Sequence, residues 1–370
     1  MNHLGNWRNG ELGNFITLKR GFDLPQQKRE DGQVPIFSSS GITGTHSTAM
    51  VNAPGVITGR YGTIGEVFYA AEDFWPLNTT LFVEDFHGND AEFIYYFLKT
   101  LEWSKFTSAS AVPGINRNTV HKETVSLPDI ETQRRIASTL SMLDEKIKTN
   151  TEINDNLYAQ AKAIFDNHFI NIDAIPAGWR KGNLLDIANY LNGLAMQKFR
   201  PQGNEIGLPV LKIKELRQGS CDDSSELCSL RIKPEYIIHD GDVIFSWSGS
   251  LLVDIWCGGT CGLNQHLFKV TSDIYDKWFY YLWTAHHLAR FIAIAADKAT
   301  TMGHIKREEL AKAEVLIPCE EDYTSLTSIM QPIFELIISN RIEARKLAAL
   351  RDELLPKLMS GEIDVSAIQL

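Results

Sequence analysis

Cysteine is scarce in this chain of 370 residues, and its few cysteines follow no familiar pattern. The five are Cys221, Cys228, Cys257, Cys261 and Cys319. An odd and sparse set in a long chain is typical of reduced thiols, not of a disulfide framework. The first four could in principle ligate zinc, but their intervals are not those of a zinc knuckle, and the first half of the chain has no counterpart. We expect no metal site.

Long apolar runs and an apolar leader are also missing. No stretch approaches the ~18 apolar residues of a membrane span. The opening residues, MNHLGNWRNG, are polar and do not resemble a secretion signal. A hydrophobic content of 44% and a charged content of 22% are ordinary for a soluble globular chain. The expectation is a cytoplasmic protein of two or three domains.

Positive charge is not in excess, since the net charge is −10. No large block of the chain is basic overall, which argues against a simple basic nucleic-acid binder. Any nucleic-acid surface must therefore be a local patch, or a partner must supply part of the affinity.

Catalytic motifs are absent as well. No glycine-rich run carries the Lys-Ser/Thr of a nucleotide-binding loop, and residues 59–65 (GRYGTIG) lack the spacing of the dinucleotide fingerprint. The Asn/Asp-Pro-Pro-aromatic motif of amino-methyltransferases is missing. Asp144-Glu145-Lys146 resembles part of a nuclease pattern, but its position on a long helix favours a solvated face. The pair His286-His287 is interpreted as structural. We expect a non-catalytic chain with no cofactor of its own.

What the sequence does contain is a repeated amphipathic helix. In residues 136–169 apolar side chains recur at steps of four and three, the narrow stripe of a helix that packs along one partner. Adding 190 to each position reproduces the stripe in the last part of the chain, from Leu326 to Leu354, with Asn150 and Asn340 at the same position. Two such helices in one register indicate a duplicated chain whose helices pack on each other.

The repeat extends into the globular parts. Trp7-Arg8 matches Trp179-Arg180 at an offset of 172, residues 55–57 match 242–244 at 187, and residues 81–82 match 267–268 at 186. The largest drift lies between residues 21 and 56, where the second copy is 15 residues longer. This insert fits either two modules that meet different partners or ordinary drift in surface loops.

Each globular part is predicted to be mixed. Short β-prone segments separated by turn residues predict strands at 34–37, 55–58, 66–69 and 80–83 in the first copy, a helix at 91–101 and a last strand at 125–128. The fold class expected is α+β, with a pseudo-twofold repeat of two tandem mixed α/β domains separated by two long antiparallel helices that form a coiled coil. The expected boundaries are 1–130, 131–170, 171–318 and 319–370.

Polar loops occur at matching places in both halves and combine small residues with Arg, Lys or His. Such side chains bind phosphate oxygens, and arginine can also read guanine. Taken singly, each loop is better explained as a solubilising turn, so the functional interpretation depends on the matched recurrence of the loops in both halves. The expected DNA contacts are Arg20, Ser39, Ser40, Thr43, His46, Arg60, Tyr61, Thr63, Ser110, Asn116 and Arg117 in the first half, and Lys198, Arg200, Lys212, Lys214, Ser246, Trp247, Ser248, Lys298, Thr300, Thr301, His304 and Lys306 in the second.

With these features the chain resembles the specificity subunit of type I restriction–modification enzymes over nearly its whole length. The resemblance rests on the Trp-Arg openings, the helix entry ETQRRI at 131–136 and the closing LLPKLMSGEI at 354–363. The second helix entry departs from the motif, because EDYTS stands at 321–325. The resemblance implies two target recognition domains, each reading half of a split DNA sequence. It also implies docking of two methyltransferase subunits and recruitment of restriction/translocase subunits, with S-adenosylmethionine, ATP and Mg on those partners.

Helix length agrees with this function. A helix over 136–169 spans roughly 50 Å at ~1.5 Å per residue, about one to one and a half turns of DNA. A pairing of Asn150 with Asn340 on the apolar stripe would fix the register of the two helices at some cost in stability. The alternative is a protein-binding scaffold whose duplicated modules grip peptides and whose helices oligomerise, without DNA specificity.

Overall fold

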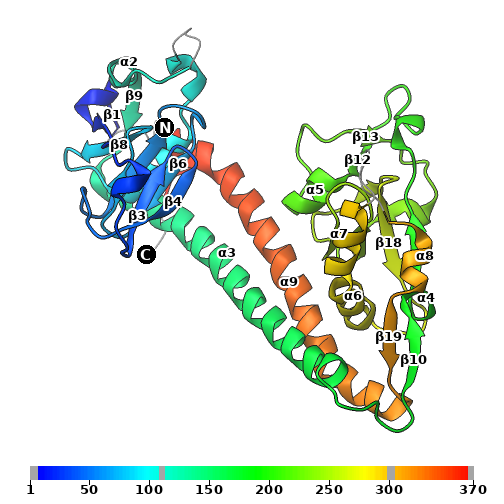
Figure 1. Ribbon diagram of the computed structural model, residues 1–370. Helices are drawn as coiled ribbons and strands as arrows, with labels where there is room; N and C mark the ends of the chain where they lie inside the picture. The colour runs from blue at the N-terminus through cyan, green and yellow to red at the C-terminus, as the bar shows by residue number, and fades with distance from the viewer. Residues whose placement is uncertain (1–6, 108–112, 298–304, 366–370) are drawn as a thin grey trace. The chain divides into compact units, whose positions relative to one another are not determined.

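The chain forms two compact units in a computed structural model that describes residues 7–107, 113–297 and 305–365 (Figure 1). The first unit comprises Met1–Glu145 with Ala348–Leu370, and the second comprises Lys146–Leu347. Each unit holds one globular domain and part of both long helices. None of the helices in the described ranges is long and apolar enough to cross a membrane.

The first domain is built around an antiparallel four-stranded sheet in the order β2-β8-β5-β6. A three-stranded sheet, β4-β3-β7, and a two-stranded sheet, β1-β9, complete it, and α1 packs on β5 and β6. The elements are β1 (Arg8–Glu11), β2 (Thr17–Arg20), β3 (Val34–Ser38), β4 (Gly41–His46), β5 (Gly55–Gly59), β6 (Val67–Ala70), β7 (Trp75–Pro76), β8 (Thr80–Asp85), β9 (Thr124–Leu127), α1 (Ala91–Lys99) and α2 (Arg117–His121), with 3-10 turns at Leu12–Asn14, Gln26–Lys28 and Trp103–Phe106.

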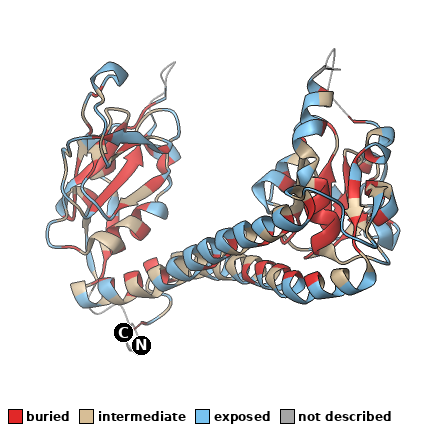
Figure 2. Ribbon diagram, turned by 60° about the horizontal axis from the view of Figure 1, so that its bottom comes forward, coloured by how far each residue is buried: buried red, intermediate tan, exposed pale blue. Residues whose placement is uncertain are grey.

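The second domain repeats this plan, with sheets β11-β18-β15-β16, β13-β12-β17-β14 and β10-β19. Helix α6 packs on β16 and β18. Figure 2 shows the central strands of each domain buried. The elements are β10 (Arg180–Asn183), β11 (Asn189–Asn192), β12 (Leu208–Leu211), β13 (Leu227–Cys228), β14 (Ile237–Ile238), β15 (Val243–Ser246), β16 (Leu252–Ile255), β17 (Cys261–Leu263), β18 (Leu267–Thr271), β19 (Glu314–Ile317), α4 (Leu184–Ile187), α5 (Ile213–Gln218), α6 (Lys277–His286), α7 (Leu288–Asp297) and α8 (Arg307–Ala311), with 3-10 turns at Met196–Lys198 and Pro234–Tyr236.

Strand pairing shows that the two domains share one framework. Arg8 pairs with Leu127 in β1-β9, and Arg180 pairs with Ile317 in β10-β19. A Cβ on Gly21 would lie 2.2 Å from the Leu77 carbonyl oxygen, and one on Gly193 would lie 2.2 Å from that of Asn264, so both strands approach a turn too closely for a side chain. This contact makes Leu77 equivalent to Asn264. The offset in this turn is therefore 187, and the value of 186 expected from sequence is corrected by one residue.

The insert between β12 and β15 accounts for 13 of the 15 extra residues of the second copy, because Phe37 and Val56 are 19 positions apart whereas the equivalent Leu211 and Val243 are 32 apart. It contains α5, the loop that follows it, and the short strands β13 and β14. Part of the insert thus adds to the sheet around β12 and β17. The rest forms an exposed loop at residues 219–224.

The two long helices are α3 (Ile130–Phe165), which ends in a π-helical turn at Asp166–Ile170, and α9 (Glu320–Met359). In the second unit Asn154 pairs with Asn340 and Asn150 with Glu343. In the first unit Asp144 accepts a hydrogen bond from Arg351 Nη1 at 2.5 Å. Earlier residues of α3 thus meet later residues of α9 in both units, which confirms the antiparallel pairing expected from the repeat.

The start of each long helix is fixed to its domain by the same kind of bond. Gln133, fully buried, accepts a hydrogen bond from the backbone N–H of Asp90 at 2.9 Å. At the equivalent place the Tyr323 hydroxyl accepts from the N–H of Asp276 at 2.6 Å. The sequence departure at the second helix entry therefore preserves the contact, because a phenol oxygen replaces an amide oxygen.

The crossing point of the helix pair, which the sequence leaves open, does not place Asn150 against Asn340. Asn340 Nδ2 donates to Asn154 Oδ1 at 3.0 Å, and Asn154 Nδ2 donates to the Ile337 carbonyl at 3.1 Å. By the pseudo-twofold repeat Asn154 corresponds to Ala344, which lines the same small cavity as Asn150. Asn150 donates to Glu343 at 2.7 Å, while its buried Oδ1 has no hydrogen-bond partner among the described residues. Asn340 therefore meets the residue that lies four positions after Asn150 in α3.

Replacing Asn340 by leucine should destabilise the second unit by about 1–3 kcal/mol, because Asn154 Oδ1 loses its donor inside the helix pair. Replacing both Asn154 and Asn340 by leucine should recover most of that loss, since neither of these two positions then leaves a buried polar side chain unpaired. Urea unfolding of the full chain measures both effects, with the exposed Asn156→Leu as the matched control. A double variant less stable than Asn340→Leu would contradict this role.

Asp144 and Arg351 form a second polar contact, this time in the first unit. The Tyr96 hydroxyl donates to Asp144 Oδ2 at 2.6 Å, and Arg351 pairs with the other carboxylate oxygen. Burial raises the pKa of Tyr96, and the hydrogen bond to Asp144 raises it further. Arg351 stands at an apolar position of the repeated stripe, and Asp144 neutralises its charge there. Asp144 belongs to this contact, which corrects the expectation of a solvated face.

The closing residues of the chain complete the core of the first domain. Leu358, Met359 and Val365 are buried in one cluster with residues of β2, β5, β8 and α1. Gly361, at a φ of 73°, ends α9 and turns the chain back, so that the Glu362 and Ile363 N–H groups bond the Lys357 carbonyl. The first domain therefore needs residues from both ends of the sequence.

Candidate nucleic-acid interface

A basic cavity of about 610 Å³ lies on the first domain. It brings together β2, the turn after β5 and the N-terminus of α2, which are far apart in sequence. Five of the predicted DNA contacts line it, namely Arg20, Arg60, Tyr61, Asn116 and Arg117. Sequence analysis missed Lys19, Gly114 and Asn118, which line it too. The signal that could have identified Lys19 was its position next to Arg20 on the same strand.

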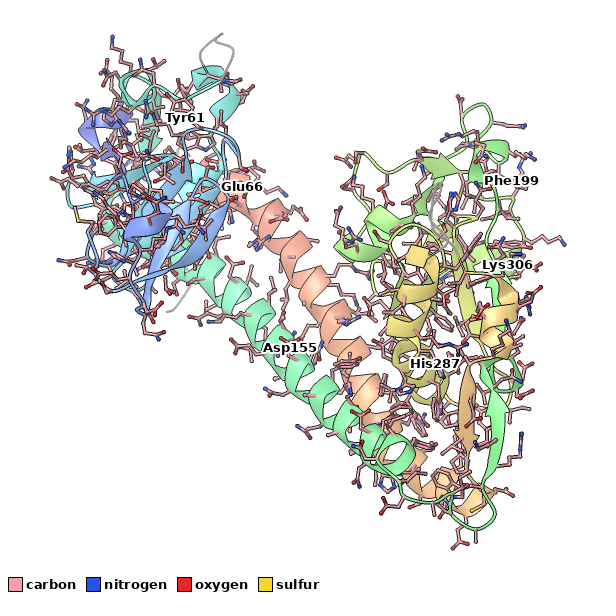
Figure 3. All side chains as sticks on the ribbon, in the orientation of Figure 1. Tyr61, Glu66, Asp155, Phe199, His287 and Lys306 are labelled. Carbon is pink, nitrogen blue, oxygen red and sulfur yellow. The ribbon has the colours of Figure 1, made fainter. Side chains whose placement is uncertain are left out.

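Arg60 is held in this cavity by its backbone and by its neighbour. Its N–H donates to the Thr79 carbonyl at 2.8 Å, and its own carbonyl accepts from the Ile115 N–H at 3.0 Å. The guanidinium lies over the Tyr61 ring, 4.5 Å from the centroid. Such a cation–π contact orients the group without neutralising its charge. Tyr61 lies on the first domain, away from the long helices (Figure 3).

Gly114 is required for this arrangement. A Cβ at residue 114 would lie 2.2 Å from Tyr61 Cε1, so any side chain there displaces the ring on which Arg60 rests. The close approach ties residues 113–116 to the turn that carries Arg60 and Tyr61. The cavity wall is therefore set by a glycine contact between two distant segments.

The other cations of the cavity differ in their partners. Lys19 pairs with Glu84, and Arg20 pairs with Asp23 at 3.4 Å; all four side chains are well exposed, so these pairs contribute little stability. Arg117 begins α2, after the N-cap Asn116. Among the described residues no carboxylate lies within ion-pair distance of Arg60 or Arg117. Four cations thus converge in an otherwise acidic chain.

His121 anchors the helix that carries Arg117. Its Nε2 accepts the N–H of Leu18 in β2 at 2.9 Å, so the ring is neutral with its proton on Nδ1. Burial lowers the pKa of His121, and the charges of Arg117 and His87 lower it further. The bond therefore holds α2 against β2 at neutral pH.

The remaining predicted contacts of the first half are spread over its loops. Ser39, Ser40, Thr43 and Thr63 are at least partly exposed. His46 is buried instead, where its Nδ1 accepts the Glu30 N–H at 3.0 Å and its ring meets Trp75 edge to face. The structure gives His46 a framework role. Ser110 lies outside the described residues.

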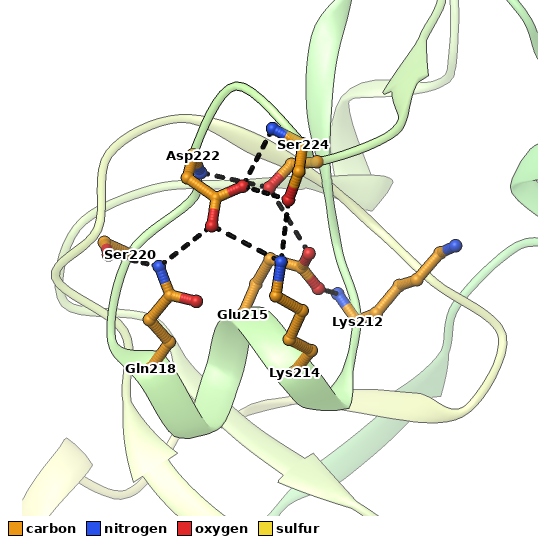
Figure 4. Close-up of polar contacts among 8 residues, drawn as sticks. Lys212, Lys214, Glu215, Gln218, Ser220, Asp222 and Ser224 are labelled. Carbon is orange, nitrogen blue, oxygen red and sulfur yellow. Dashed lines mark hydrogen bonds and ion pairs between the residues drawn. The ribbon is translucent and has the colours of Figure 1, made fainter. Parts of the chain in front are cut away.

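In the second domain two of the predicted lysines are engaged by acidic partners, and Figure 4 shows the contacts of Lys214 with Asp222 and Ser224. Lys214 Nζ lies 2.8 Å from Ser224 Oγ and 3.3 Å from Asp222 Oδ2, and Lys212 pairs with Glu226. The hydrogen bond from Lys212 lowers the pKa of the Glu226 carboxyl. Arg200 pairs with the same Glu226 at 2.7 Å. These cations therefore fasten the insert to β12 and its flanks.

The turn after β15 holds the other predicted residues of the second half. Ser246 and Ser248 are buried, and their hydroxyls bond the Ser250 carbonyl at 2.9 Å and His266 Nδ1 at 3.0 Å. Both belong to the framework of the turn, whereas Trp247 is partly exposed between them. Lys198 and Lys306 are exposed. Four predicted contacts lie outside the described residues: Lys298, Thr300, Thr301 and His304.

Cysteines and histidines do not assemble into a metal centre in the part of the chain that the structure describes. Cys221 and Cys261 share one apolar cluster of the second domain, while Cys228 lies in another. His287 Nε2 lies 2.8 Å from the Glu314 carbonyl, and burial lowers the pKa of both His286 and His287. These cysteines and histidines therefore contribute to the packing of the second domain.

The two halves of the chain thus share one fold, carry polar loops at matching places and each end in a long helix, and the first domain holds a basic cavity. The family described as "Type I restriction modification DNA specificity domain" matches the chain twice, over residues 5–159 and 176–350. The chain belongs to this family. It is therefore a recognition subunit and not an enzyme, and the match favours DNA recognition over the protein-binding scaffold.

Relatives and a solved structure agree. The chain is 26% identical over 310 residues to the type I restriction enzyme MjaIX specificity subunit of Methanocaldococcus jannaschii, across 76% of this chain and 71% of that protein. It is 20% identical over 354 residues to the HindI specificity subunit of Haemophilus influenzae, across 74% and 77%. Its fold is similar to that of the S subunit from M. genitalium, with a TM-score of 0.64 and 15% identity over 97% of both chains.

Proposed function

We propose that the chain selects a split DNA sequence, with one half read by the basic cavity of the first domain and the other by the turn around Trp247 in the second. The observation that carries this proposal is the convergence of Lys19, Arg20, Arg60 and Arg117 in a chain of net charge −10. A local cluster of cations amid acidic surroundings suits base selection at a few contacts, with much of the phosphate neutralisation left to partners.

The partners are two methyltransferase subunits docked on the long helices, with restriction/translocase subunits joining that assembly. Large apolar side chains on the outer faces of the helices support this. On α9, Ile329 and Leu336 are about half exposed and lie seven residues apart, on one face. S-adenosylmethionine, ATP and Mg belong to the partners. Selecting bound duplexes from a random pool, with the methyltransferase present, tests DNA recognition directly; no enriched split sequence would refute it.

The lengths of α3 and α9 set the spacer between the two half-sites in this proposal. Inserting four residues into both helices adds about 6 Å to each at ~1.5 Å per residue. The recognised spacer should therefore change by about two base pairs at ~3.4 Å per pair, and the half-site sequences should not change. Mapping methylated adenines in a strain that carries the variant measures both.

Substitutions that keep the helix lengths, Lys148→Ala in α3 and Lys346→Ala in α9, are the matched control and should leave the spacer as it is. A spacer that stays unchanged after the paired insertion contradicts the ruler. Altered half-site sequences would show instead that the insertion had disturbed the reading domains.

A further inference from the structure

The two domains hold one residue in the same backbone frame at the mouth of the reading turn. In the first domain Arg60 is fixed between the Thr79 carbonyl at 2.8 Å and the Ile115 N–H at 3.0 Å. In the second, Trp247 is fixed between the His266 carbonyl at 3.4 Å and the Ile305 N–H at 3.1 Å. Offsets of 187 and 190 relate these residues, the same offsets that relate their strands and helices. Residues 60 and 247 therefore occupy one position of a duplicated site.

The side chains at this shared position are chemically unlike. Arg60 carries a forked donor that rests on Tyr61 and has no carboxylate within ion-pair distance among the described residues. Trp247 carries a single N–H, which donates to Asn192 Oδ1 at 3.0 Å, and its ring packs on Phe268 with centroids 5.8 Å apart. The neighbours differ likewise, because Asn192 in β11 stands where Arg20 stands in β2.

We propose that Arg60 reads a guanine of the first half-site, and that Trp247, at the same place in the second domain, makes an apolar contact with its half-site and reads no guanine there. This inference rests on the proposed DNA recognition. It follows that residue 60/247 is a position at which the two halves of the chain acquire different sequence specificity.

The chemistry supports guanine as the partner of Arg60. A guanidinium donates two parallel hydrogen bonds to the O6 and N7 acceptors that guanine presents in the major groove. Adenine offers N7 beside an amino donor and cannot accept both. Holding the guanidinium over a ring fixes its plane before binding, which lowers the entropy lost when two bonds form together. An indole with its one donor already used leaves an apolar face, which suits a thymine methyl group.

The test is selection from a random duplex pool with the full chain and its methyltransferase partner. In the Arg60→Gln variant, discrimination for guanine at one position of one half-site should fall about 10- to 100-fold, and adenine should be favoured there because glutamine pairs with adenine. The other half-site should keep its sequence. Gly114→Ala, which displaces Tyr61, should lose guanine discrimination at the same position without gaining adenine.

Arg20→Gln is the matched control, since it removes a cation from the same cavity. It should weaken binding about equally across sequences and retain the guanine. Trp247→Leu should alter the other half-site only. An unchanged base preference in Arg60→Gln, or an Arg60-dependent base other than guanine, overturns the assignment. If the wild-type complex enriches no sequence at all, the proposed function fails, and that result is distinct from a site insensitive to Arg60.

Discussion

Leu358→Ala should destabilise the first domain by about 2–5 kcal/mol, although residue 358 lies more than 200 positions from that domain in the sequence. The side chain is 1% exposed and packs in the cluster that contains Ile136 and Leu140 of α3 together with strands of the domain. Truncation removes buried methyl groups and leaves a cavity that the surrounding β-sheet cannot close. Native-state hydrogen exchange of amides in β5 and β8 measures the loss.

The same helix provides the control for this prediction. Leu350 is 44% exposed on the outside of α9, so Leu350→Ala makes the same chemical change away from the core. It should alter the free energy of unfolding by no more than about 0.5 kcal/mol. Amides in β15 and β18 of the second domain should exchange as in the wild type in both variants. Equal effects at residues 350 and 358 would show that the closing segment does not belong to the core of the first domain.

Replacing Arg60 and Arg117 together by alanine should weaken binding to the first half-site about 30- to 20,000-fold. Each arginine bound to a base or phosphate is worth roughly 1–3 kcal/mol, and these two lack carboxylate partners among the described residues. The salt dependence should also become shallower, by about one unit of log–log slope for each phosphate that is no longer neutralised. Titration of the assembled complex with duplex DNA at several salt concentrations measures both quantities.

Lys28→Ala with Lys99→Ala removes the same charge from the first domain outside the cavity. This pair tests whether the weakening depends on place or only on net charge, and we expect a change of less than about threefold. Wild-type affinity in the double arginine variant would remove the cavity from the interface. A similar weakening in both double variants would mean that binding responds to total charge alone.

The elements that local pattern predicts were found close to their expected limits. The segments at 34–37, 55–58, 66–69 and 80–83 became β3, β5, β6 and β8, because β-prone runs bounded by turn residues specify short strands. The amphipathic repeat predicted two paired helices, and the structure pairs them in antiparallel order. Periodicity over many residues is a strong local signal, which explains why these predictions were confirmed.

Features that depend on long-range contacts were not predictable in this way. The grouping of Arg60, Arg117 and Lys19 requires β2, β5 and α2 to meet, and nothing in their separate patterns encodes that meeting. The ion pairs of Lys212 and Lys214 with residues of the insert likewise depend on how a loop folds back. The partner of Asn340 could not be predicted, because sequence fixes the register within each helix and not the crossing point between the two.

The sequence by itself determined that this protein is a duplication with two alternating globular parts and two matched helices, since repeats and periodicity are properties of the chain. Tertiary structure alone decided that the last residues complete the first domain, that Asn154 and not Asn150 meets Asn340, and that Arg60 and Trp247 share one position. The physical reason is that hydrophobic burial and hydrogen-bond pairing join segments distant in sequence, and the energy of those contacts depends on geometry that no single segment contains.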